Sequence, residues 1–219
     1  MACCMPAEEE ARQDLDAHVL AGILSWAYDA RPDPIRPPVE PFPARAKRSP
    51  ADAAFYARWR FYTYWPVGVS LLESYLVARH HALSIPEKGW IGAQCEAWLS
   101  IWEALEIRLD VGMRMRDLLT GEERFVFASA ESRQLMVGAC VLARVISFSR
   151  KACLCGGHPN PMTRRAGAAA AIVARDLVAR GRALPEGERI PIAWMQEEAT
   201  AGMLVDLWEE ATAHARTAN

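Results

Sequence analysis

Two cysteines and a histidine lie within six residues of one another in the stretch KACLCGGHPNPM, residues 151–162. Thiolate and imidazole groups are preferred ligands of zinc, and a thiol beside a histidine is also a common enzymatic nucleophile. On a strand, Cys153 and Cys155 point to the same face, whereas the glycines and proline that follow predict a turn that carries His158 away. The spacing therefore predicts the end of a strand. A metal protein or an enzyme that uses Cys153, Cys155 and His158 is the alternative.

Two further cysteines, Cys3 and Cys4, are adjacent near the N-terminus. A structural zinc site needs four ligands, so these two thiols cannot complete one by themselves. We expect no cofactor, and zinc binding at Cys3 and Cys4 only if the chain extends upstream of Met1.

The segment MRMRDLLTGE, residues 113–122, alternates methionine and arginine. In a strand this alternation places Arg114 and Arg116 on one face and the methionines on the other. The aspartate and the Thr-Gly pair that follow fit a chain reversal. The simplest interpretation is a strand with one solvated face. The functional one is a small arginine surface that binds phosphate or carboxylate groups. Its candidate binding residues are Arg114, Arg116, Asp117, Arg124 and Arg144.

Aromatic and arginine side chains also alternate in FYARWRFYTYW, residues 55–65. Such interleaving occurs where aromatic rings stack on the bases of single-stranded nucleic acid. Phe55, Trp59 and Tyr62 are nevertheless spaced by three or four residues, which is typical of a helix that packs one face onto a core. We expect a core helix here.

The chain of 219 residues has a formal net charge of −2 and a pI of about 6.2. This balance gives no overall attraction to nucleic acid or to anionic membranes. The N-terminal residues lack the basic and apolar regions of a secretory signal, and no apolar run is long enough to cross a bilayer. We therefore expect a cytoplasmic protein without membrane association, whose six cysteines are free thiols or metal ligands.

Hydrophobic spacing predicts the elements that position these side chains. Residues 1–48 predict one amphipathic helix followed by a proline-rich linker. Residues 49–219 predict one domain, with helices over 49–97, strands over 98–156 and two helices over 164–216. The fold class is thus α+β, with N-terminal helices, a small antiparallel sheet or barrel in the middle, and two C-terminal helices.

Three blocks in the middle of the chain form a pattern that goes beyond periodicity. They are WLSIWEALEI, MRDLLTGEERFVF and SRQLMVGACVLARVISF, preceded by FYTYWPVGVSLLESYL. Over residues 55–150 this succession resembles the conserved region of bacterial SEC-C motif-containing proteins. The resemblance implies an uncharacterised α+β protein and brings no catalytic assignment with it. The family is named for a short zinc motif, C-x-C followed by C-C or C-H. In this chain that motif is absent or truncated, and Cys3 and Cys4 match only its second half.

No nucleotide-binding, serine-hydrolase or zinc-protease motif occurs in the sequence, which argues against an enzyme. The leading hypothesis is a non-catalytic interaction or adaptor module, with a protein partner favoured. Nucleic-acid or ribosome-associated binding is the alternative that the interleaved arginines and aromatics suggest. The metal protein or enzyme based on the cysteine pair is the third hypothesis.

Overall fold

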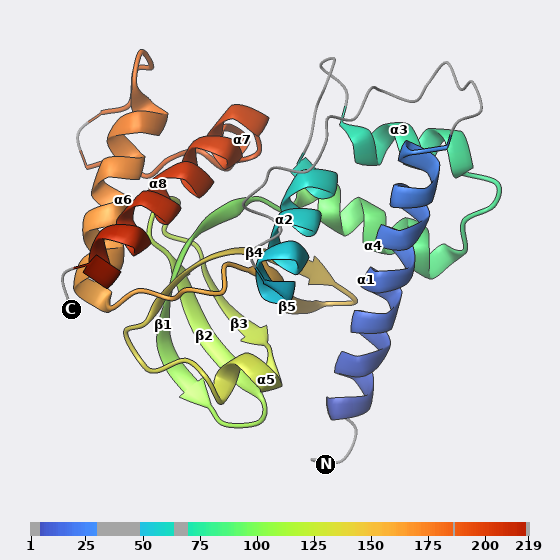
Figure 1. Cartoon of the computed structure of the whole chain (residues 1–219), viewed down its shortest axis with the longest axis horizontal. Coiled ribbons are helices and arrows are strands. Elements are labelled where there is room, and N and C mark those ends of the chain that lie inside the picture. Colours follow the sequence, from blue (N-terminus) through green and yellow to red (C-terminus); the bar gives the residue numbers. More distant parts are fainter. Residues whose placement is uncertain (1–4, 30–48, 64–69, 186, 218–219) are drawn as a thin grey trace.

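The computed structural model describes residues 5–29, 49–63, 70–185 and 187–217 (Figure 1). Within these ranges, helices precede and follow a barrel of five strands. The first helices are α1 (Met5–Ala27), α2 (Pro50–Thr63), α3 (Leu71–Arg79) and α4 (Ile85–Glu96). The strands are β1 (Leu99–Arg108), β2 (Gly112–Asp117), β3 (Glu123–Phe127), β4 (Cys140–Phe148) and β5 (Lys151–Gly157), with α5 (Ser129–Ser132) between β3 and β4. The barrel is followed by α6 (Arg164–Ala179), α7 (Ile192–Met195) and α8 (Glu198–Thr217).

The strands close into a barrel in the order β1-β2-β3-β5-β4. Every neighbouring pair is antiparallel except β3 and β5, which are parallel. This order, with one short helix between the third and fourth strands, is that of an OB-type barrel. Alternate side chains fill its interior, among them Trp102, Met113, Met115 and Val126.

Two groups of helices cover different sides of the barrel (Figure 1). Helices α1 to α4 pack over the outer face of β4 and β5, where Ile146, Cys153 and Cys155 join their core. Helices α6 and α8 pack over β1 and β4, and Trp208 of α8 is fully buried in this second core. Of the described helices, only α5 packs closely against β2 or β3. The outer face of these two strands is therefore largely open.

Local signals explain where the helices near β5 begin. The side chain of Ser49 accepts a hydrogen bond from the backbone N–H of Asp52 at 3.1 Å, and α2 begins at Pro50, as the Ser-Pro pair predicts. Ser84 and Glu87 form a reciprocal capping box at the start of α4. These caps fix the first turns of two helices that face the barrel.

The predicted α+β class and the order of helices, strands and helices are confirmed. The predicted antiparallel sheet or barrel is not entirely antiparallel, since β3 and β5 are parallel. A closed barrel with an odd number of strands must contain at least one parallel pair. The last predicted helix is divided into α7 and α8 near Gln196, whose side chain donates a hydrogen bond to the carbonyl of Glu96 at 2.8 Å.

The predicted proline-rich linker lies almost entirely outside the described residues, and the domain boundary at residue 48 stays a prediction. Helix α1 contributes Val19 and Ile23 to the same core as β5. Among the described residues, no helix has both the length and the apolar character needed to span a bilayer.

Candidate functional site

The cysteine pair lies in β5, the last strand of the barrel in the sequence, as its spacing predicts. Cys153 and Cys155 are buried on the same outer face of the barrel, beneath the N-terminal helices. His158 follows the strand and packs against the rings of Phe55 and Trp208 in the other core. No group of three or more metal-ligating side chains occurs among the described residues. The structure thus separates the histidine from the two thiols.

Burial keeps the thiol of Cys155 in its protonated form. Desolvation, followed by the charge of Asp16, raises its pKa to about 12. The side-chain amide of Gln94 donates a hydrogen bond to the sulfur at 2.8 Å. Since a thiol acts as a nucleophile or metal ligand only after it loses its proton, this environment suppresses both reactions. The other two candidates, Cys3 and Cys4, lie outside the described residues.

The strand register divides the predicted arginine surface. Arg114 and Arg116 lie on the outward face of β2 and alternate with buried methionines, as predicted. Arg124 is paired with Met115 across β2 and β3, so it belongs to the opposite face. Its guanidinium lies over the indole of Trp98, 4.8 Å from the ring centroid. The four arginines therefore do not form one surface.

Arg144 is 1% exposed, and the expectation that it contributes to a surface is wrong. Its Nη2 donates hydrogen bonds to the backbone carbonyl of Gln94 at 2.7 Å and to the side-chain oxygen at 3.4 Å. The guanidinium also lies 5.9 Å from the ring centroid of Tyr62. Desolvation lowers the pKa of Arg144. This arginine ties α4 and α2 to β4, because the helices cover its face of the strand.

Asp117 closes the turn between β2 and β3 and is buried. Its carboxylate accepts hydrogen bonds from the Trp98 indole at 2.7 Å and from the Ser100 hydroxyl at 2.6 Å. The backbone N–H groups of Leu119 and Thr120 donate to it at 2.8 and 3.2 Å. This arrangement agrees with the turn that the sequence predicts and leaves the carboxylate without access to a ligand.

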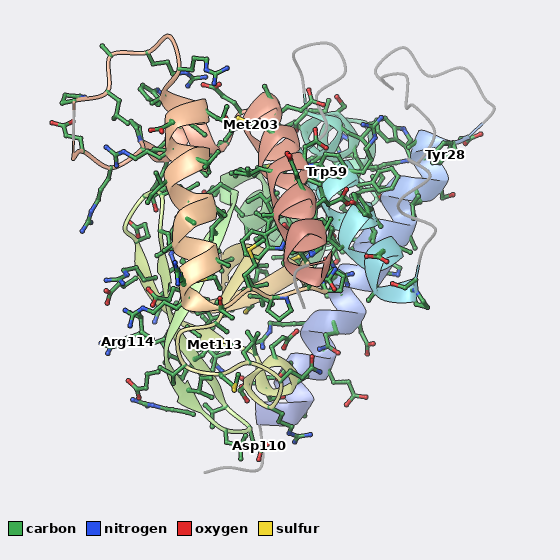
Figure 2. All side chains as sticks on the ribbon, turned by 60° about the vertical axis from the view of Figure 1, so that its left-hand side comes forward. Tyr28, Trp59, Asp110, Met113, Arg114 and Met203 are labelled. Carbon is green, nitrogen blue, oxygen red and sulfur yellow. The ribbon has the colours of Figure 1, made fainter. Side chains whose placement is uncertain are left out.

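The outward side of β2 and β3 carries two half-buried aromatic rings. Phe125 and Phe127 contact each other edge to face, with their centroids 5.2 Å apart. The guanidinium of Arg108 lies 5.1 Å from the centroid of Phe125, and the ammonium of Lys151 lies 5.4 Å from that of Phe127. Arg114 is opposite Phe125 in the register, and its side chain points away from the barrel (Figure 2). These five residues are named the barrel face.

Acidic side chains compensate the positive charges of the barrel face. Glu106 accepts a hydrogen bond from Arg108 at 3.0 Å and lies 3.8 Å from Nε of Arg114. Glu8 of α1 pairs with Lys151. Exposed ion pairs of this kind contribute about 0–1 kcal/mol each. Their cations can therefore exchange these carboxylates for the anions of a ligand at little cost.

A buried polar junction joins α1, α2 and α4 to β5. Asp16 of α1 is 4% exposed, and its carboxylate accepts hydrogen bonds from Nε of Arg58 at 2.8 Å and the hydroxyl of Tyr62 at 2.6 Å. Nη2 of Arg58 lies 2.7 Å away, and the Trp90 indole donates at 3.3 Å. Desolvation, and then the charge of Asp16, raise the pKa of Tyr62 well above its usual value. The junction holds α1 against the barrel.

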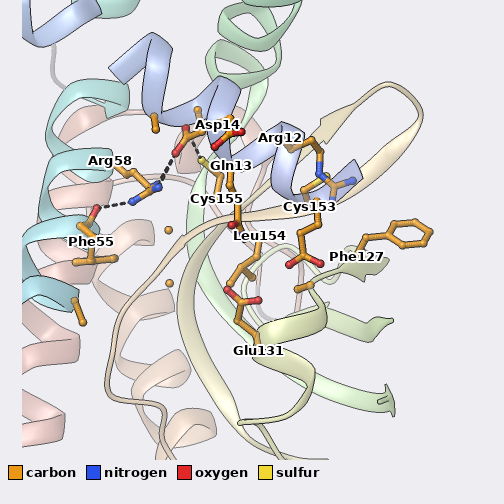
Figure 3. A pocket seen from close by; sticks show the side chains of 18 of the residues that line it. Arg12, Gln13, Asp14, Phe55, Arg58, Phe127, Glu131, Cys153, Leu154 and Cys155 are labelled. Carbon is orange, nitrogen blue, oxygen red and sulfur yellow. Dashed lines mark hydrogen bonds and ion pairs between the residues drawn. The ribbon is translucent and has the colours of Figure 1, made fainter. Parts of the chain in front are cut away.

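A cavity of about 690 Å³ lies next to this junction, between α1, α2, α5 and β5 (Figure 3). Its charged lining consists of four carboxylates and two guanidinium groups, those of Glu9, Asp14, Asp16, Glu131, Arg12 and Arg58. The apolar part of the wall includes Phe55, Cys153 and Leu154. Figure 3 shows the carboxylate of Glu131 pointing from α5 toward β5. The cavity is large enough for a small organic ligand.

No protein-family model, curated protein or solved structure matches this chain. The resemblance to SEC-C motif-containing proteins therefore stays a prediction. Fold and site define the class of protein: an α+β protein with an OB-type barrel, an open barrel face and an adjacent cavity.

Several important side chains were not among the candidates from the sequence. Phe125 and Phe127 alternate with the buried Val126, and this period of two was a sufficient signal for their common outward face. Asp16 lies one turn before the apolar pair of residues 19 and 20, which marks a carboxylate near the buried side of a helix. Glu131 had no such signal, because its surroundings depend on how α1 packs.

Proposed function

We propose that this protein is a non-catalytic binding module and that its barrel face binds single-stranded nucleic acid. The observation that supports this most strongly is the pair Phe125 and Phe127, flanked by Arg108 and Lys151 on an uncovered part of the barrel. Bases stack on aromatic rings of this kind while neighbouring cations contact the phosphates.

The strand order adds independent support. In OB-type barrels the face of the second and third strands binds oligonucleotides, and the barrel face lies on β2 and β3. Fold alone does not assign a function, so the proposal depends on the side chains present at that position. Here they supply both aromatic rings and cations held only by weak ion pairs.

The side chains also set the expected strength of binding. Stacking contributes about 1–3 kcal/mol for each base, and the two rings accommodate about two bases. Contacts of Arg108, Arg114 and Lys151 with about three phosphates predict that log K decreases with log salt concentration with a slope of about −2. Because the net charge of the chain is only −2, affinity in the micromolar range at low salt is expected.

Fluorescence anisotropy of a labelled oligo-dT strand of about 12 nucleotides tests this proposal. The substitution Phe125→Ala should weaken binding by about 5- to 150-fold, which corresponds to the loss of one stacked base. Tyr28→Ala is the matched control, because Tyr28 is a 52% exposed aromatic directly after α1, outside the barrel face. Equal affinities of the two variants would refute the stacking role of the barrel face.

A protein partner is the second candidate, and the mixed charges beside the barrel face favour it. Arg116 pairs with the buried Glu103 at 2.8 Å, and complementary charges of both signs are typical of surfaces that recognise proteins. The double substitution Arg114→Ala and Arg116→Ala should then release a co-purifying protein. The fold should persist, since Glu103 also pairs with Arg164 at 2.7 Å. Loss of such a partner, without oligonucleotide binding by the unmodified protein, would replace the nucleic-acid proposal.

A further inference from the structure

The cavity between α1, α2, α5 and β5 has more negative than positive groups in its lining, with four carboxylates against the guanidinium groups of Arg12 and Arg58. Asp16 is paired with Arg58, and both residues line the cavity. Glu9, which also lines it, accepts hydrogen bonds from the backbone N–H of Ser129 at 3.1 and 3.2 Å. Among the described residues, neither Glu9 nor Glu131 forms an ion pair. Two carboxylates that form no salt bridge with a described residue thus line the same space.

The surroundings of Glu131 make ionisation of its carboxyl group less favourable than in water. Desolvation is the main cause that raises the pKa of Glu131, and the nearby carboxylate of Glu9 adds to it, whereas a backbone hydrogen bond and the charge of Arg58 act in the opposite direction. In the folded protein the side chain is half-buried and points into the cavity (Figure 3). A positive group placed between the two carboxylates would relieve both effects.

The remaining wall determines what kind of cation fits. Phe55, Leu154 and Cys153 provide an apolar surface beside the carboxylates. A bare metal ion needs several oxygen or sulfur ligands, and the described residues contain no group of three. A volume of about 690 Å³ also lies within the range of sites for small organic molecules. The combination fits a molecule with one charged end and one apolar end.

We propose that this cavity is a binding site for a small organic amine, with its ammonium between Glu9 and Glu131 and its apolar part against β5. The ammonium supplies a salt-bridge partner for the two carboxylates and donates charge-assisted hydrogen bonds to them. The apolar part is removed from water against Leu154 and Phe55. This site adjoins the barrel face, because Phe127 lines the cavity as well, but the amine proposal does not depend on nucleic-acid binding.

Titration calorimetry with phenethylamine as the probe tests the site. We expect saturable binding with a stoichiometry of about one and a Kd on the order of 1 mM or tighter. Phenethyl alcohol and 3-phenylpropionate have similar shapes without the positive charge, and both should bind at least about tenfold more weakly. Equal binding of the three compounds, or no saturable binding of the amine, would overturn the proposal.

The substitution Glu131→Gln keeps the shape of the side chain and removes its charge, so it should weaken amine binding by about tenfold. Glu188→Gln is the matched control, because Glu188 is exposed in the loop after α6 and does not line the cavity. If the Glu131 variant fails to fold, Glu9→Gln makes the same prediction. Unchanged amine affinity in a folded variant at either position would contradict the assignment.

Discussion

Replacement of Asp16 with alanine should destabilise the fold by several kcal/mol, because it removes the acceptor at the centre of the buried junction. Asp16 accepts hydrogen bonds from Arg58, Tyr62 and Trp90 and is 4% exposed. Removing one partner of a buried ion pair typically costs about 3–5 kcal/mol, since the other charge is left uncompensated. Arg58 keeps a hydrogen bond to the carbonyl of Ala54 at 3.2 Å, and its side chain is 24% exposed. We therefore expect a loss of about 3 kcal/mol, at the lower end of that range.

Urea unfolding, followed by tryptophan fluorescence, measures this loss as a decrease in the free energy of unfolding. Asp14→Ala is the control on the same helix, because Asp14 is exposed, and it should change stability by less than about 0.5 kcal/mol. The double variant Asp16→Ala with Arg58→Met removes both charges and should recover part of the loss. A loss for Asp16→Ala no larger than that of the control would refute the idea that this carboxylate holds α1 on the barrel.

Four further predictions concern packing and ionisation. Gly167→Ala should lower the melting temperature, by a destabilisation of about 1–3 kcal/mol, because its Cβ would collide with the side chain of Cys140. Gly202→Ala in α8 meets no atom within 4 Å and should instead stabilise the protein by about 0.5–1 kcal/mol. With a pKa of about 12, only about one in 10⁴ molecules has a Cys155 thiolate at pH 8, so iodoacetamide should label Cys155 only after unfolding. Rapid labelling of the native protein, mapped by mass spectrometry, would contradict this. Because the pKa of Glu131 is raised, the folded state binds the proton of this carboxyl group more tightly than the unfolded state does. Proton binding therefore adds to the free energy of unfolding below the usual pKa of glutamate. This contribution is lost as the pH rises through the raised pKa. The Glu131→Gln variant should therefore have a larger free energy of unfolding than the unmodified protein at pH 7 and the same value at pH 4. If urea unfolding gives the same difference between the two proteins at both pH values, this reasoning is wrong.

The sequence predicted the strands well because their signals are local. The alternation in residues 113–116 and the glycine-bounded segments of the middle region correspond to β2 and its neighbours. The aromatic stripe of residues 55–62 lies on a core helix, where Phe55 and Tyr62 are buried, as its spacing predicts. Both outcomes depend on contacts between residues only a few positions apart.

The composition of the candidate site could not be predicted in the same way. Arg124 and Arg144 have the same residue type as Arg114, yet the register places one on the opposite face and the packing of α4 buries the other. No property of the isolated strands distinguishes these arginines. The difference arises from pairings between segments that are distant in the sequence.

The amino-acid sequence by itself determined the class of the fold, the order of the elements and the placement of the cysteine pair on one face of a strand. Hydrophobic periodicity encodes these features because each side chain faces water or core according to its place in a turn or pleat. Only the tertiary structure decided how the barrel closes, that Asp16 meets Arg58, and that Glu9 and Glu131 share a cavity. Barrel closure and helix docking depend on the summed burial of many distant side chains, so no short segment specifies them.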